Sequence, residues 1–377
     1  MRDVLLRIDA ATPATRDRGI DALRALAILG VVLGHWLVTA LVVDSGTLRA
    51  ASPLHYMPAL APVSWALQTL AVFFFVGGYV AARGHASARA ARTPHARWLR
   101  ARLDRLFRPV AAVLAVWAAV LGVLLASGAG YVTVRALGKL ALSPLWFLLV
   151  FAVLTAATPL AARLHPLWPL AVTGCVDLWR LRFDGPAALG WVNVAAGWLV
   201  PYALGARGAR RGLPGRRTAC VLLGGGGAAA TAGLVLAAGY PAAMVGVPGA
   251  AVSNLDPPTL AAVTFGLAQC GAALLLLGPL RRALRRPAAW AAVALLNLSA
   301  MTVFLWHQTA MMAVSALGLL AGGALPGLHT LPDGGGWVAA RLLWLPLFAA
   351  VLLVCRAAFQ TYERGRTRQA RYLGWGE

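Results

Sequence analysis

The chain has 377 residues, of which 60% are hydrophobic and only 12% are charged. A soluble domain carries about 25% charged residues, so this composition excludes an ordinary soluble protein and indicates an all-α, polytopic membrane protein. The formal net charge of +22 suits nucleic-acid binding, but arginines gathered in the cytoplasmic loops of a membrane protein produce the same excess.

The apolar stretches along the chain predict about ten membrane-spanning helices. A span needs about 20 mostly apolar residues to cross the hydrocarbon core of a bilayer. The first stretch is not followed by an A-x-A-like cleavage site, so it predicts a span rather than a signal peptide. The expected spans are 20–43, 61–82, 109–126, 142–162, 167–183, 186–206, 219–238, 259–279, 290–318 and 337–355.

The distribution of the arginines supports this arrangement. If the N-terminus is cytoplasmic, the inside segments hold 27 arginines and the outside loops hold only five basic residues. This positive-inside pattern fits an even number of spans with both termini in the cytoplasm, and it argues against nucleic-acid binding. The expected organisation is a cytoplasmic segment at 1–18, a ten-helix membrane domain at 19–359 and a basic cytoplasmic tail at 360–377.

The longest cytoplasmic loop, residues 83–108, carries eight of these arginines. Its second half has the composition of a basic helix that lies along the membrane surface. Two roles remain open for this loop: contact with anionic lipids, or binding of a phosphorylated cytosolic ligand. The loops 239–258 and 319–336 are rich in Gly and Pro, and we expect them to cover the opposite mouth of the domain.

The first span contains three ionisable residues, Asp21, Arg24 and His35. Arg24 and His35 are eleven positions apart, which places them on one face of a helix and roughly 16 Å apart along its axis. Asp21 and Arg24 have the spacing of an ion pair near the cytoplasmic end. His35 lies too deep to reach the interface, so its ring must be neutral and either buried in protein or facing a cavity. Such a residue is a functional hypothesis by default, with an interhelical hydrogen bond as the structural alternative.

Two more ionisable residues lie well inside predicted spans. His307, in FLWHQTAMM, has a depth similar to that of His35, so the two histidines are candidates to line one chamber. The alternative is an aromatic anchor with Trp306 at the lipid headgroups. Asp177 is the lone carboxylate in the middle of a span. Its expected partner is either Arg180 one turn on or His35 across the bundle.

Several common catalytic motifs are absent from the sequence. The chain has no H-E-x-x-H, no G-x-S-x-G and no acidic cluster, so we expect neither a metal site nor a serine hydrolase. The GGGG run at 224–227 lies in an apolar span, and we interpret it as a place of close helix packing rather than a phosphate loop. The four cysteines lie in apolar runs without C-x-x-C spacing, which predicts neither disulfides nor metal binding.

Five stretches resemble the motifs of acyltransferase family 3, a family of integral-membrane acyltransferases, and together they run from residue 18 to about 310. In chain order they match the opening helix, the second-helix motif, an R-x-x-R element before a proline, a Trp-Phe helix and a late helix ending in His. The stretches are RGIDALRALAILGVVLGHW, AVFFFVGGYVAARG, RLDRLFRP, PLWFLLVFAVLTAATPL and MTVFLWH. Two departures are Gly77-Gly78, where the family often has Ser-Gly, and one extra residue between Arg105 and Pro109.

The resemblance implies roles for particular residues. It makes His35 the catalytic histidine and Arg24 its companion on the opening helix. Arg102 and Arg105 are similar to the arginines of the R-x-x-R element, with Arg108 as an alternative, and we expect Arg24, Arg102 and Arg105 to bind the polyanionic donor CoA. The further residues expected in the pocket are Asp21, Trp146, Asp177 and His307.

The activity implied by the resemblance is transfer of an acyl group, often acetyl, from cytosolic acyl-CoA to a hydroxyl. The acceptor would be a glycan, a lipid-linked sugar or a small metabolite, and a neutral histidine suits this chemistry as general base. We expect no permanently bound cofactor and no metal. The partners are acyl-CoA as co-substrate, the hydroxyl-bearing acceptor and membrane lipids.

The alternative function is a transporter or flippase for a polar or lipid-linked substrate, because intramembrane charges also mark transport paths. Transporters often contain internal repeats, and no convincing repeat relates the two halves of this sequence. The composition, rich in Ala, Arg and Gly, is typical of a high-GC bacterial genome, which predicts the bacterial plasma (inner) membrane as the location.

Overall fold

The computed structural model describes residues 2–13 and 15–363, and this part of the chain is almost entirely helical. The all-α, polytopic prediction is confirmed. The chain divides into two compact units. The first unit consists of Met1–Val31, Ala61–Leu99 and Val150–Leu298, and the second consists of Val32–Leu60, Arg100–Leu149 and Ser299–Glu377. The helices that contribute residues to both units are α2 (Arg18–Val38), α6 (His95–Ala126) and α8 (Leu145–Ala156).

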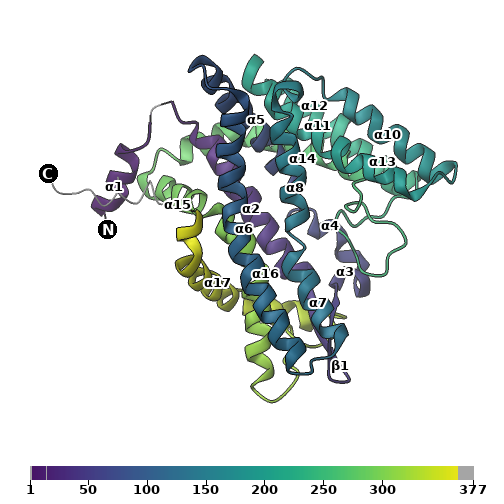
Figure 1. Ribbon diagram of the computed structural model, residues 1–377. Helices are drawn as coiled ribbons and strands as arrows, with labels where there is room; N and C mark the ends of the chain where they lie inside the picture. The colour runs from purple at the N-terminus through teal and green to yellow at the C-terminus, as the bar shows by residue number, and fades with distance from the viewer. Residues whose placement is uncertain (1, 14, 364–377) are drawn as a thin grey trace. The chain divides into compact units, whose positions relative to one another are not determined.

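The first unit includes helices α5, α11 and α14, which are labelled in Figure 1. Within it, α5 packs against α11, α12 against α14, and α1 against α15. Besides its parts of α2, α6 and α8, its elements are α1 (Arg2–Ala10), α4 (Ala61–Ser64), α5 (Leu70–Ala90), α9 (Thr158–Ala161), α10 (Leu167–Arg182), η2 (Ala187–Leu189), α11 (Gly190–Arg211), α12 (Arg216–Leu223), the π-helical η3 (Gly224–Ala229), α13 (Ala230–Ala237), α14 (Leu260–Ala283) and α15 (Pro287–Leu298).

Small residues allow helices of the first unit to approach each other closely. A Cβ atom on Gly78 would collide with the backbone carbonyl of Tyr202 in α11, and one on Gly77 would collide with the ring of Phe151. The Gly-Gly pair is therefore a packing element in this chain. A serine at either position would require the neighbouring helix or ring to move.

The second unit is built on α16 (Ala300–Leu319) and α17 (Gly335–Glu363), which pack against each other. Its core also includes α7, which contacts α16 and strand β2. Besides its parts of α2, α6 and α8, its elements are β1 (Ala40–Asp44), β2 (Thr47–Ala51), α3 (Pro53–Tyr56), η1 (Pro58–Leu60), α7 (Tyr131–Leu142), α16 and α17. The predicted basic tail, 360–377, completes α17 as far as Glu363, and its remainder lies outside the described residues.

A β-hairpin follows α2 directly, so the prediction of a span from 20 to 43 is wrong at its end. Strands β1 and β2 pair antiparallel, with Val42 opposite Arg49. Ser45 and Gly46 form the turn with φ angles of 49° and 79°, the left-handed values that a tight two-residue hairpin requires. The β-branched Val42 and Val43 favour a strand. The helix therefore ends at Val38, close after His35.

Eight helical segments of the described chain are long and apolar enough to cross a membrane: α2, α6, α7 with α8, η2 with α11, α12 with α13, α14, α16 and α17. The other two predicted spans, 61–82 and 167–183, correspond to α5 and α10, which are helical but fall outside this set. Helix α10 has only 16 residues, and α5 carries Arg83, His85 and Arg89 in its second half.

Three predicted boundaries need correction. The segment expected at 142–162 begins at Tyr131, so Arg135 and Lys139 lie in helix α7 rather than in a loop. The segment expected at 290–318 is broken at Ser299, between α15 and α16. The basic second half of the loop 83–108 is not a separate surface helix, because α6 runs without interruption from His95 into the apolar stretch.

The GGGG run forms the π-helical segment η3. A Cβ atom on Gly227 would collide with the backbone of Ala268 in α14, so the predicted close packing is confirmed at that position. It is wrong for Gly224 and Gly225, because no atom of another described helix lies within 4 Å of a Cβ built on either residue. The four cysteines are free thiols.

Candidate functional site

Helix α2 carries two groups of polar contacts, and they belong to different units. Asp21 and Arg24 lie in the first unit, and His35 lies in the second. All three residues are part of one helix, Arg18–Val38, as the sequence predicted. We describe the two groups separately.

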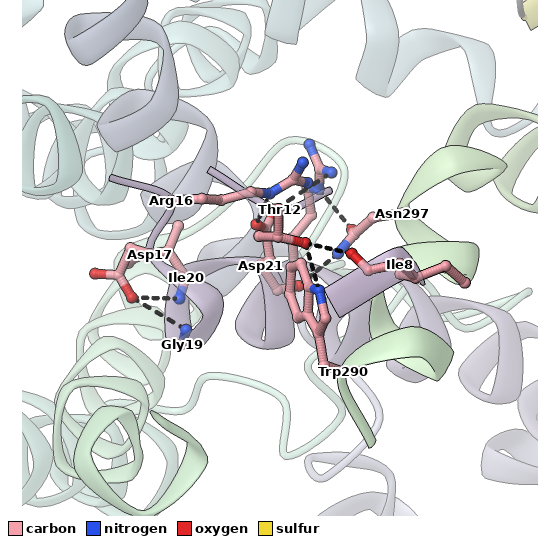
Figure 2. Close-up of polar contacts among 10 residues, drawn as sticks. Ile8, Thr12, Arg16, Asp17, Gly19, Ile20, Asp21, Trp290 and Asn297 are labelled. Atoms are coloured by element: carbon pink, nitrogen blue, oxygen red, sulfur yellow. Dashed lines mark hydrogen bonds and ion pairs between the residues drawn. The ribbon is translucent and has the colours of Figure 1, made fainter. Parts of the chain in front are cut away.

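Asp21 pairs with two arginines, Arg16 and Arg24, of which Figure 2 labels Arg16. Its carboxylate accepts a hydrogen bond of 2.6 Å from Nε of Arg16 and forms an ion pair of 3.6 Å with Arg24. The predicted pairing of Asp21 with Arg24 is therefore confirmed. Arg24 Nε also donates to Oδ1 of Asn297 at 2.7 Å, and Nδ2 of Asn297 donates to the Asp21 carbonyl at 2.8 Å. Helix α15 thus fixes the guanidinium of Arg24.

The segment before α2 is fixed to α15 as well. Trp290 Nε1 donates a hydrogen bond of 2.7 Å to the hydroxyl of Thr12, and this bond is drawn in Figure 2. The guanidinium groups of Arg16 and Arg18 lie 5.5 Å and 4.9 Å from the centre of the Trp290 ring. These cation–π contacts explain why part of the N-terminal segment predicted at 1–18 is ordered on the domain.

Asp17 begins helix α2. Its Oδ1 accepts hydrogen bonds from the backbone N–H groups of Gly19 and Ile20, as an N-cap residue does, and its carboxylate pairs with Arg281 at 2.5 Å. Burial raises the pKa of Asp17, but the Arg281 guanidinium and the two N–H groups outweigh this effect. The pKa of the carboxyl group is therefore below its ordinary value.

His35 lies near the C-terminal end of α2 and contacts α16. Its Nδ1 is 3.0 Å from Nε2 of Gln308, and its ring centre is 5.0 Å from that of His307. The side chain is half-buried, and within the described residues Gln308 is the one hydrogen-bond partner of the ring. The structure thus brings the two predicted histidines together inside the second unit.

His307 is completely buried, and its proton can be placed. Nδ1 lies 2.5 Å from the carbonyl oxygen of Phe304. A carbonyl oxygen only accepts, so Nδ1 carries the proton and Nε2 of the neutral ring is an acceptor. Nε2 of His307 and Oε1 of Gln308 are both buried without a hydrogen-bond partner among the described residues. Leaving a buried polar atom unpaired costs about 1–3 kcal/mol, so both atoms are suited to receive a donor from a ligand.

One aromatic interpretation in this region needs correction. Trp306 is not an anchor at the lipid headgroups, because it is buried and stacks on Phe359 with 3.8 Å between ring centres. Trp146, predicted as a pocket residue, is 37% exposed and contacts Phe147 edge to face. Phe147 is the buried member of this pair and packs on Phe304, one turn before His307.

Arg341 fixes the end of helix α2. Its guanidinium is buried and donates to the carbonyl oxygens of Trp36 and Thr39 at 2.6 Å each and of Gly327 at 2.9 Å. It also lies over the ring of Phe348, 4.7 Å from the ring centre. The last carbonyls of a helix have no partner within the helix and carry partial negative charge, so a cation stabilises them. This contact positions the turn that carries His35.

The arginines expected to bind the donor lie on α6. Arg102 and Arg105 are three positions apart, which places them on one face of the helix. Arg105 is exposed, and its Nε donates to the carbonyl of Ala101 in the same helix at 3.0 Å. Arg108 is also exposed, whereas Arg102 is half-buried. All three belong to the second unit with His35, whereas Arg24 belongs to the first.

Asp177 makes its contacts within the first unit. Its carboxylate accepts hydrogen bonds from Nδ2 of Asn193 at 2.8 Å, from the hydroxyl of Tyr240 at 3.1 Å and from the backbone N–H of Leu260 at 2.6 Å. The predicted partner Arg180 lies 4.0 Å away, so its contact is the weakest of the set. The buried carboxylate thus fastens α10 to α11 and to the start of α14.

The chemical capacity of the second unit is proton transfer by a neutral imidazole. Within the described residues there is no group of three or more His, Cys, Asp or Glu side chains that could hold a metal ion. His35 and His307 provide two imidazole rings, and Gln308 provides an amide that contacts one of them. A neutral imidazole in such a setting can accept a proton from a hydroxyl group and return it.

Sequence reasoning missed three residues of these two groups. Gln308 follows His307 directly, so the polar pair inside an apolar stretch was an available signal. Asn297 had no such signal, because only the fold brings it to Arg24. Arg341 appeared in the sequence as a basic residue within a span, and its role depends on the carbonyl oxygens that the fold places around it.

Comparison with known protein families matches residues 17–359 to the acyltransferase 3 family, described as an acyltransferase domain. The match covers nearly the whole chain and includes Asp21, Arg24 and His35. No curated protein and no solved structure matches the chain.

Proposed function

Because the chain belongs to the acyltransferase 3 family and is a multi-pass membrane acyltransferase, we propose that it transfers an acyl group from acyl-CoA to a hydroxyl group, with His35 as general base. The observation that carries this proposal is the contact of His35 with Gln308 and His307 inside the protein. A histidine facing lipid would have no substrate to deprotonate. The half-buried ring of His35 instead contacts two polar side chains of α16, those of Gln308 and His307.

The proposed reaction has one proton acceptor and one leaving group. A ring nitrogen of His35 takes the proton of the acceptor hydroxyl while the oxygen attacks the thioester carbonyl carbon. The tetrahedral intermediate then collapses, the C–S bond breaks, and the CoA thiolate leaves. The imidazolium returns its proton to the thiolate, which restores the neutral histidine and releases CoA.

The proposed donor site consists of arginines. CoA carries several phosphate charges, which guanidinium groups bind through paired hydrogen bonds. Arg102 and Arg105 share one face of α6, and both belong to the second unit, as His35 does.

The proposed location and acceptor follow from the same chemistry. CoA is cytosolic, so the arginine-rich loops face the cytoplasm, in agreement with the positive-inside pattern. Both termini are then cytoplasmic, in a bacterial plasma membrane. The acceptor is a hydroxyl of a glycan, a lipid-linked sugar or a small metabolite, and acetyl is the proposed acyl group.

The test uses the full chain purified in detergent with labelled acetyl-CoA and a panel of hydroxyl-bearing acceptors. We expect release of free CoA thiol and transfer of the label to an acceptor. His35→Ala should abolish both, whereas His55→Ala, the same change at an exposed histidine of α3, should leave them intact. Normal turnover by His35→Ala refutes the assignment of the base. Substrate counterflow in vesicles without any acyl donor would support a transporter instead.

The donor site has its own test. Arg102→Ala combined with Arg105→Ala should weaken acyl-CoA binding about 10- to 100-fold, because two charge-assisted contacts are lost. The control is Arg97→Ala combined with Arg100→Ala, which removes two exposed arginines of the same spacing from a different face of α6. Equal effects of the two double variants on CoA affinity, measured by calorimetry, contradict the proposed site.

A further inference from the structure

Gln308 is the residue that the proposed mechanism does not yet use. Its carboxamide is buried on α16, and it makes the hydrogen bond to Nδ1 of His35. Nδ1 determines the tautomer of a neutral histidine, because the partner of one ring nitrogen decides which nitrogen holds the proton. We propose that Gln308 is a positioning residue that controls where the proton of His35 resides. This inference rests on the proposed function of His35.

The two ends of the carboxamide select opposite tautomers. In the structure the amide nitrogen of Gln308 faces Nδ1 of His35 at 3.0 Å. An amide nitrogen only donates, so Nδ1 is the acceptor and the proton of His35 sits on Nε2. Nε2 then has no free lone pair and cannot act as a base. When the carboxamide turns over, its oxygen accepts a proton from Nδ1, and Nε2 presents a free lone pair to the acceptor hydroxyl.

The surroundings of Gln308 make both orientations accessible. In the observed orientation Oε1 is buried without a hydrogen-bond partner among the described residues. In the reversed orientation Oε1 gains the bond to Nδ1, and the amide nitrogen loses its bond. Each state leaves one end of the carboxamide unpaired, so burial favours neither strongly. The terminal torsion of glutamine is broad, which allows the turn without rearrangement of α16.

The charged and titratable groups near His35 favour the neutral form of its ring. On α16, His307 already donates from Nδ1 to the Phe304 carbonyl, so a second proton on it would add a positive charge 5.0 Å from the His35 ring. On α17, Arg341 binds the carbonyls of Trp36 and Thr39 next to His35 on α2. The guanidinium of Arg341 opposes a second positive charge on His35, and within the described residues no carboxylate is hydrogen-bonded to the His35 ring. The ring therefore works from its neutral form, in which the tautomer decides activity.

The first test reads the tautomer directly and needs no acceptor. Histidine labelled with ¹⁵N in the full chain gives ring-nitrogen shifts that distinguish a protonated from a bare nitrogen, and the spectrum of His35→Asn assigns the His35 signals. We expect the ligand-free protein to hold the proton on Nε2. Gln308→Glu offers only acceptor oxygens when ionised and should move the proton to Nδ1.

The second test follows the pH dependence of acyl transfer. Gln308→Glu should keep activity and shift the acidic limb of the kcat/KM profile upward by about one pH unit or more, because a carboxylate stabilises the imidazolium. Gln308→Met has a similar volume but no polar end, and it should lower kcat about 10- to 100-fold with little change in the KM for acyl-CoA. Gln360→Glu, the same change in half-buried surroundings of α17, is the control and should leave the profile unchanged.

The outcomes separate this inference from the proposed function. If the wild type transfers acyl groups and His35→Ala does not, but the tautomer and the pH profile are the same in Gln308→Glu and wild type, Gln308 is only a packing residue and the inference is refuted. A ligand-free ring that already holds its proton on Nδ1 also refutes it. Absence of acyl transfer by the wild type would instead refute the proposed function, while the tautomer measurement would still decide the role of Gln308.

Discussion

Asp177 and His35 are both ionisable residues within apolar helices, and the structure treats them differently. The Asp177 carboxylate accepts three hydrogen bonds, from Asn193, Tyr240 and the backbone N–H of Leu260. His35 has a single hydrogen bond, to Gln308, within the described residues. Both carboxylate oxygens of Asp177 thus have hydrogen-bond partners in the protein. One ring nitrogen of His35 has none among the described residues and can bind another partner.

The difference shows how a structural role and a catalytic role can be separated for polar residues in apolar helices. A buried charge costs free energy, and the fold normally compensates it with hydrogen bonds, as it does for Asp177. A reactive group must instead keep part of its hydrogen-bonding capacity free until its substrate binds. His35 and its neighbours on α16 meet this condition, because Nε2 of His307 and Oε1 of Gln308 also lack partners among the described residues.

The largest expected effect concerns His35. Its replacement by alanine should lower kcat for acyl transfer about 10²- to 10⁴-fold, the usual contribution of a general base. Stability should change little, because only one hydrogen bond of about 1 kcal/mol is lost. Turnover and thermal unfolding of the same detergent preparation measure the two effects. A large loss of stability with normal activity per folded molecule would give His35 the structural role that we expect for Asp177.

The opposite pattern is expected for Asp177. Asp177→Ala leaves the buried amide of Asn193 and the half-buried donors of Tyr240 and Leu260 without an acceptor, which should lower the free energy of unfolding by about 3 kcal/mol. Protein that remains folded should keep its rate per molecule, as turnover normalised to folded protein would show. Asp177→Asn retains one acceptor oxygen and should cost less. A loss of activity without loss of stability would assign Asp177 to the reaction.

Replacement of Arg341 should lower both the stability of the protein and its rate of acyl transfer. Arg341→Lys keeps the positive charge but cannot reach the carbonyls of Trp36, Thr39 and Gly327 together, so it should cost about 2 kcal/mol. Because these bonds position the turn of His35, kcat should fall about ten-fold as well. Circular dichroism during heating and steady-state kinetics measure the two effects. An unchanged rate would mean that α2 is positioned without this arginine.

The smallest effect is expected at the surface, where Asp17 pairs with Arg281. Arg281 is 49% exposed, so solvent screens the pair and Asp17→Asn should cost only about 0.5 kcal/mol. The pKa of Asp17 is lowered in the folded state, so its contribution is present above its unfolded pKa of about 3.9 and is lost as the pH falls through the folded value. Unfolding curves of wild type and variant should therefore converge in acid. A constant difference at every pH would exclude this ion pair as its cause.

The amino-acid sequence alone determined the class of fold. Apolar length and arginine placement predicted a helical membrane protein, because the cost of burying backbone and charge in lipid leaves few alternatives. Helix periodicity also predicted the pairing of Asp21 with Arg24 and the shared helix of Arg24 and His35. These features are local, since they depend on residues within a few turns of one another.

Only the tertiary structure decided the partners of these groups. The contacts of Arg24 with Asn297, of His35 with Gln308, and of Arg341 with the end of α2 join residues separated by more than 270 positions. The hairpin after Val38 and the break at Ser299 also depend on short turns that apolar composition does not reveal. Periodicity specifies which face of a helix a side chain occupies, but the neighbour that meets this face is chosen by packing across the whole chain.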